Sequence, residues 1–130
     1  MSANADVAYN FAVIRAVPHP HLGSFVNVGV VLHVRTAGFL RARVQSDPAA
    51  LRRLVPGADA ELLARYLLAC RAICDGDPAA GPVALAPTSE RFHWLTSPRS
   101  DVIQASPVHE GLCGDPAITL DELFEAFVRL

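Results

Sequence analysis

One polar segment in the last third of the sequence gathers residue types that catalysis and ligand binding use. It runs from Arg99 to Cys113 and contains Gln104, Ser106 and His109. His109 could carry a proton near neutral pH, with Ser106 or Cys113 as a nucleophile and Arg99 as a clamp for an anion. The same polar groups could instead hydrogen-bond to one another and hold a loop in place. No nucleophile elbow or diagnostic aspartate spacing accompanies them, which favours a structural loop or a binding surface over catalysis.

A second set of polar residues lies on two predicted strands. Alternation over residues 26–34 predicts that Asn27 and His33 share one strand face, and Arg41 and Arg43 share a face of the next strand. Because residues two apart on a strand stand about 7 Å apart, the two arginines could hold an anionic group between them. A solvated sheet face tolerates arginines without any ligand, and we favour that interpretation. Asn27, Arg41 and Arg43 join Arg99, Gln104 and His109 as candidate binding residues.

Histidine and cysteine spacings do not predict a metal site. Cys70 and Cys74 stand one helical turn apart, and His19 and His21 flank a proline, but neither pair has the further ligands that a metal needs. Three cysteines also make no disulfide framework. We therefore expect no metal and no cofactor.

Composition excludes several classes of function. All 11 basic residues are arginine, so Schiff-base chemistry and a phosphate-binding loop lysine are absent. The net charge of −2 argues against general binding to nucleic acid, which depends on a surplus of basic residues. No apolar run approaches the roughly 20 residues that span a bilayer, and no basic leader is present. We expect a cytoplasmic protein that does not enter the membrane.

The hydrophobic pattern predicts alternating groups of strands and helices in one domain. A length of 130 residues suits a single domain over residues 1–130, with residues 1–6 as a flexible N-terminus. Strands are expected over residues 9–17, 26–34, 39–44 and 101–105, the first three as an antiparallel meander. The predicted class is α+β: an antiparallel sheet of three to four strands with helices packed on one face, as a two-layer sandwich. An unpaired sheet edge would allow a homodimer.

Acidic and hydroxyl residues mark where the helices are expected to begin. Asp47 before Pro48 predicts a short helix, and Asp59 caps a second helix that continues to about Ile73. Residues 89–94 fit either a short helix or an extended edge. Asp115-Pro116 is interpreted as a turn, and a capping box over residues 119–122 predicts the start of a last helix that runs to the final residue.

Several motifs, in order along the chain, carry a family resemblance. They are Tyr9-Asn-Phe-Ala-Val-Ile-Arg15, residues 25–32, Phe39-Leu-Arg-Ala-Arg43, Glu90-Arg-Phe-His-Trp-Leu95, Pro98-Arg-Ser100, Val102-Ile-Gln104, Ser106-Pro-Val-His109, Gly111-Leu112 and Asp115-Pro116. In these motifs the chain resembles the bacterial DUF3037 family, and the C-terminal run resembles an actinobacterial-type branch of it.

The resemblance implies a context rather than a mechanism. It implies a small bacterial protein of uncharacterised function, with a HipA-like kinase encoded nearby as a partner. We therefore expect an accessory protein that acts through protein contact, modulates such a kinase and has no catalysis of its own. The alternative is a small hydrolase, or a protein that binds an anion or metabolite, using Arg99, Ser106 and His109. A sensor whose bound metabolite alters a partner interface is a third interpretation.

Overall fold

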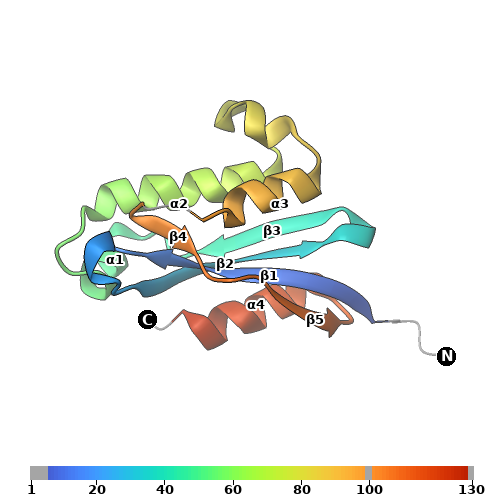
Figure 1. Cartoon of the computed structure of the whole chain (residues 1–130), viewed down its shortest axis with the longest axis horizontal. Helices are drawn as coiled ribbons and strands as arrows, with labels where there is room; N and C mark the ends of the chain where they lie inside the picture. The colour runs from blue at the N-terminus through green and yellow to red at the C-terminus, as the bar shows by residue number, and fades with distance from the viewer. Residues whose placement is uncertain (1–5, 99–100, 129–130) are drawn as a thin grey trace.

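The computed structural model describes residues 6–98 and 101–128 as one antiparallel sheet with helices around it (Figure 1). The strands are β1 Val7–Ala16, β2 Val26–Val34, β3 Phe39–Val44, β4 Ile103–Ala105 and β5 His109–Cys113. The α-helices are α1 Pro48–Leu54, α2 Ala60–Asp75, α3 Thr88–Thr96 and α4 Pro116–Phe127. Short 3₁₀ turns cover Pro20–Leu22, Arg35–Ala37, Pro78–Ala80 and Pro82–Leu85. The predicted α+β class with an antiparallel sheet is therefore confirmed.

Five strands occupy only four positions in this sheet. The order is β3-β2-β1-β4, and β5 also pairs with β1. Ile14–Ala16 of β1 pair with β4, whereas Val7–Phe11 pair with β5, and both pairings are antiparallel. The first three strands form the predicted meander. The fourth predicted strand exists as β4, but β5, which continues the same edge after a break, was not predicted.

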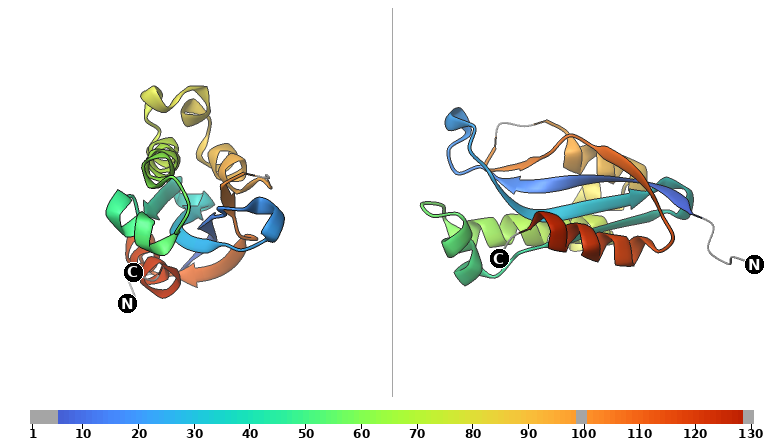
Figure 2. Two further views of the ribbon diagram at one scale, coloured as in Figure 1. Left: turned by 90° about the vertical axis from the view of Figure 1, so that its left-hand side faces the viewer. Right: turned by 90° about the horizontal axis from the view of Figure 1, so that it is seen from below.

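Helices cover both faces of the sheet, not one. Figure 1 shows α2 and α3 on one side and α4 on the other, and the end-on view in Figure 2 shows the same three layers. The prediction of helices on a single face in two layers was wrong in this respect. The reason lies in β1 and β2, whose side chains are apolar at both odd and even positions, so that both faces require cover. Phe11, Val13 and Leu32 pack under α4 with Leu120 and Phe124.

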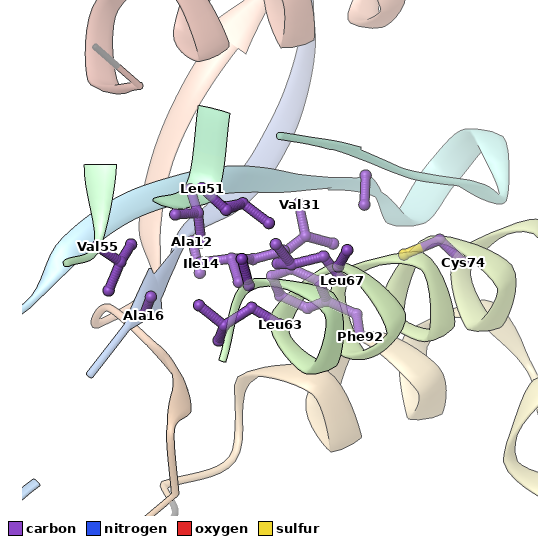
Figure 3. Close-up of a cluster of buried hydrophobic side chains, with 14 of the residues drawn as sticks. Ala12, Ile14, Ala16, Val31, Leu51, Val55, Leu63, Leu67, Cys74 and Phe92 are labelled. Atoms are coloured by element: carbon purple, nitrogen blue, oxygen red, sulfur yellow. The ribbon is translucent and has the colours of Figure 1, made fainter. Parts of the chain in front are cut away.

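The larger core lies between the sheet and helices α1, α2 and α3. Ala12 and Ile14 of β1 and Val31 of β2 meet Leu51 of α1 and Leu67 of α2 there, as Figure 3 shows. Leu51 and Leu67 are fully buried, and full burial of such a side chain stabilises the fold by about 1.5–3 kcal/mol. This core holds α2 and α3 against one face of the sheet.

Aspartates begin α1 and α2, as expected, and an aspartate also begins α4, which starts earlier than predicted. The Asp47 carboxylate accepts from the Ala49 N–H, and the Asp59 carboxylate accepts from the Leu62 N–H. Asp115 caps α4 in the same way, accepting from the Ala117 N–H, so the helix opens at Pro116 and not at the 119–122 capping box. An aspartate followed by proline suits an N-cap and the first helical position. Over the described residues, no helix combines the length and apolar character needed to cross a membrane.

Candidate functional site

Ser106, the candidate nucleophile, has a structural task at the break between β4 and β5. Its side chain is buried, and its Oγ accepts a hydrogen bond from the Val13 N–H at 2.8 Å. The same hydroxyl donates to the Pro107 carbonyl at 2.9 Å, and the Ser106 N–H donates to the Val13 carbonyl. The serine hydroxyl therefore supplies the acceptor for the Val13 N–H just past the last residue pair of β1 and β4.

The other predicted residues of this segment do not gather around Ser106. The His109 ring lies against the Phe11 ring, with 5.3 Å between centroids, and among the described residues it forms no hydrogen bond with Ser106. Gln104 donates locally to the Asp101 carbonyl and shares a shallow surface hollow with Ser106. Arg99 lies outside the described residues. The hydrogen-bonded structural loop is therefore the interpretation that the Ser106 contacts support.

The two arginines of β3 have different surroundings. Arg43 forms ion pairs with Asp121 at 3.1 Å and Glu125 at 3.2 Å, both on α4, and its guanidinium lies 4.2 Å from the centre of the Phe124 ring. Arg41 is exposed beside Phe39, 5.0 Å from that ring centre. The carboxylates of α4 already hold Arg43, so these contacts give no support to a shared anion site or to a solvated face around it.

A bulge in β2 separates Asn27 from His33. The pairing with β1 runs from Ile14 opposite Gly29 directly to Arg15 opposite Asn27, which leaves Val28 as an extra residue. The alternation of faces is reversed at that point. The Asn27 side chain consequently reaches α4 and donates to the Phe127 carbonyl at 3.0 Å, whereas His33 faces α3. The predicted shared face of Asn27 and His33 was therefore wrong.

His33 lies at the base of a cleft that the sequence did not predict. The His33 cleft has a volume of about 670 Å³. It lies between α3 and the part of the sheet formed by the start of β1 and the end of β2. Its polar lining is Asn10, His33, Arg35, Thr36, Ser89 and His93, and its apolar lining is Ala8, Phe92 and Val108. These side chains come from the start of β1, the end of β2 and the turn after it, α3, and the residue before β5.

The imidazole of His33 is held firmly in this cleft. It is 5% exposed, stacks on Phe92 with 4.9 Å between ring centroids, and its Nε2 lies 3.3 Å from the Ser89 Oγ. Burial lowers the pKa of His33 from its ordinary value, and the nearby His93 and Arg35 lower it further. At neutral pH His33 is therefore an uncharged ring that can donate one hydrogen bond and accept another.

A second open surface adjoins the cleft along β5. The β5 shelf consists of Ala8 and Asn10 on β1, Val108 before β5, and Glu110 and Leu112 on it. Leu112 lies opposite Ala8 and is 70% exposed, and Val108 is 43% exposed. Among the described strands β5 pairs only with β1, so the outer edge of β5 has backbone groups without a strand partner.

The comparison with protein families decides where the chain belongs. The family model described as "Protein of unknown function (DUF3037)" matches residues 11–128. The chain belongs to the DUF3037 family. The match confirms the resemblance that the motifs indicated. No curated protein and no solved structure matches the chain.

In this DUF3037 chain, the residues that line the cleft had weak signals in the sequence. Asn10 is a polar residue inside an apolar strand, and His33 is another, so both were detectable as exceptions. Arg35 and Ser89 lie in turn-forming and helix-start positions, where polar residues are ordinary. In the described part of the chain, no three histidine, cysteine or acidic side chains gather as a metal site would require.

Proposed function

We propose that this protein is an accessory protein that acts through contact with another protein, and that the β5 shelf is its contact surface. The carrying observation is the edge of β5, which pairs on one side only and presents Leu112 at 70% exposure. A sheet edge of this kind can accept an extended segment of a partner as an additional strand. Backbone hydrogen bonds would supply affinity, and the apolar Leu112 and Val108 side chains would supply selectivity.

A HipA-like kinase is the first partner to test. That expectation comes from the family resemblance, and it fits a chain whose candidate nucleophile, Ser106, is occupied by structural hydrogen bonds. A modulator of a kinase needs a stable surface and no active site of its own. The proposal assigns no catalytic role to Ser106 or His109.

The test is co-purification of the tagged chain with a HipA-like kinase from the same genome. Leu112→Asp places a charge on the shelf. Leu85→Asp is the matched control, because Leu85 lies in the 3₁₀ turn Pro82–Leu85, outside the shelf, and is 68% exposed. We expect wild type and Leu85→Asp to retain the kinase and Leu112→Asp to lose at least about tenfold in affinity. Thermal unfolding of all three shows whether they are equally folded. Equal retention by Leu112→Asp would contradict the proposal.

The mass of the isolated chain in solution separates a foreign partner from a second copy. Light scattering at increasing protein concentration measures it directly. We expect a monomer, since the shelf is assigned to another protein. A dimer that Leu112→Asp dissociates and Leu85→Asp does not would replace the proposed partner with a second copy of this chain.

A further inference from the structure

The His33 cleft has the lining of a binding site for a negatively charged ligand. Arg35, His33 and His93 are its ionisable side chains, and no carboxylate is among the lining residues. The guanidinium of Arg35 forms no ion pair with any described residue, in contrast to Arg43, which α4 neutralises. A cation without a carboxylate partner at the mouth of a cleft attracts anions.

Neutral donors and acceptors add to this charge at the base of the cleft. Ser89 and His33 are fixed relative to each other by their 3.3 Å contact, and Phe92 fixes the plane of the imidazole. Asn10 stands opposite His33 in the sheet register and supplies an amide. Oriented groups of this kind lose little freedom when a ligand binds, which raises affinity.

The size and the apolar wall of the cleft indicate more than a bare inorganic anion. About 670 Å³ falls within the range of roughly 300–1,000 Å³ that holds small organic ligands. Ala8, Phe92 and Val108 supply apolar surface beside the polar groups. Such a site matches a molecule with a charged end and an apolar body.

We infer that the His33 cleft binds a small organic anion, a carboxylate or phosphate monoester that carries an apolar group. Arg35 and His93 contact the anionic group, Ser89 and Asn10 hydrogen-bond to it or to its neighbour, and the apolar group lies against Phe92 and Val108. This site adjoins the proposed partner surface and shares Ala8, Asn10 and Val108 with it, but its ionisable side chains come from α3, from β2 and from the turn after β2.

Four probes resolve the two halves of this ligand. Phenyl phosphate and benzoate carry both a ring and a charge, inorganic phosphate carries the charge alone, and benzyl alcohol carries the ring alone. In NMR titrations monitored through amide chemical shifts, the resonances of Arg35, Ser89 and His93 should move as the probe binds. We expect the two aromatic anions to bind roughly tenfold more tightly than either single-feature probe. The ratio of phenyl phosphate to benzoate affinity identifies which anionic group the cleft prefers.

Variants locate the binding within the cleft. Arg35→Gln removes the unpaired cation, and Arg41→Gln is the matched control because Arg41 is also an exposed arginine but lies outside the cleft lining. We expect Arg35→Gln to weaken binding of the preferred probe roughly tenfold and Arg41→Gln to leave the binding affinity unchanged. Equal affinity in the two variants, or shifts confined to residues outside the cleft, would overturn the inference.

The two proposals fail separately. Leu112→Asp should retain ligand binding, and Arg35→Gln should retain the kinase, because Leu112 does not line the cleft and Arg35 is not part of the shelf. A wild-type protein that captures the kinase but binds none of the probes would reject the ligand site alone. A wild-type protein that binds the probes but does not capture the kinase would reject the partner surface alone.

Discussion

The hydroxyl of Ser106 accepts a hydrogen bond from the backbone N–H of Val13 across 93 residues of sequence. It stands where a backbone carbonyl would stand in an unbroken ladder, at the break that Pro107 makes between β4 and β5. The contact joins the first strand to the last part of the sheet, and it gives a side chain of a type that enzymes use in catalysis a structural role.

Ser106→Ala should therefore reduce stability. The substitution leaves the buried Val13 N–H without its acceptor, which costs about 1–3 kcal/mol of unfolding free energy. Ser24→Ala is a suitable control, because Ser24 is exposed in the loop before β2 and the substitution should change stability by less than about 0.5 kcal/mol. Urea denaturation of both variants measures the difference. A Ser106→Ala protein as stable as wild type would show that the hydroxyl does not support the sheet.

Gly29→Ala should destabilise the sheet through crowding at the β2 bulge. A Cβ at this position would lie 3.0 Å from the Arg43 carbonyl oxygen and 3.0 Å from the Val44 Cγ1. Overpacking of this kind costs about 1–3 kcal/mol. Gly114→Ala, with no atom within 4 Å of the added carbon, should be neutral or stabilising by up to about 1 kcal/mol. Thermal unfolding of both variants measures the difference in melting temperature. Similar melting temperatures for the two variants would contradict the prediction.

Arg91→Lys should loosen the segment that links α2 to α3. The Arg91 guanidinium donates to the carbonyls of Ile73 and Cys74 at the end of α2 and to that of Ala86. A lysine ammonium lacks the planar fork needed to reach all three, so we expect a loss of about 2 kcal/mol. Arg71→Lys, on the exposed side of α2, should be close to neutral. Chemical denaturation compares them, and equal midpoints would contradict the prediction.

Stability should fall in mild acid because of His33. Its pKa in the folded protein lies below the ordinary value of 6.5, so below 6.5 the unfolded chain binds the proton more readily than the folded one. The contribution is complete above pH 6.5 and is lost as the pH falls from there through the lower folded pKa. His33→Gln should flatten this dependence, whereas His21→Gln, at an exposed site, should not. An unchanged slope in His33→Gln, measured by denaturation across pH 5–7, would exclude His33 as its source.

Local patterns predicted the elements better than their arrangement. Alternation identified β2, and an aspartate before a proline identified α1, because both signals come from adjacent residues. The same aspartate–proline pattern at Asp115 was interpreted as a turn although it begins α4. β5 was missed because His109-Glu-Gly-Leu-Cys113 alternates poorly and contains a glycine.

The arrangement of the site depends on pairings that a single sequence does not contain. The bulge at Val28 reversed the face of Asn27, and nothing in a run of valines fixes where such a bulge falls. Asn10, His33 and Ser89 meet only because β1 pairs with β2 and α3 returns over them. The apolar residues at both parities of β1 did carry a signal, since strands buried on both faces have that composition.

The central place of β1 has a consequence for how the chain acquires its structure. One neighbour of β1 follows within a short loop, but β4 leaves the ribosome roughly 90 residues after its β1 partners and β5 roughly 100 residues after them. Until then the apolar strand β1 would be the edge strand of an incomplete sheet, where it could form non-native strand pairs. This chain should therefore fold slowly for a protein of its length. The rate-limiting step would be the long-range pairing of β4 and β5 with β1.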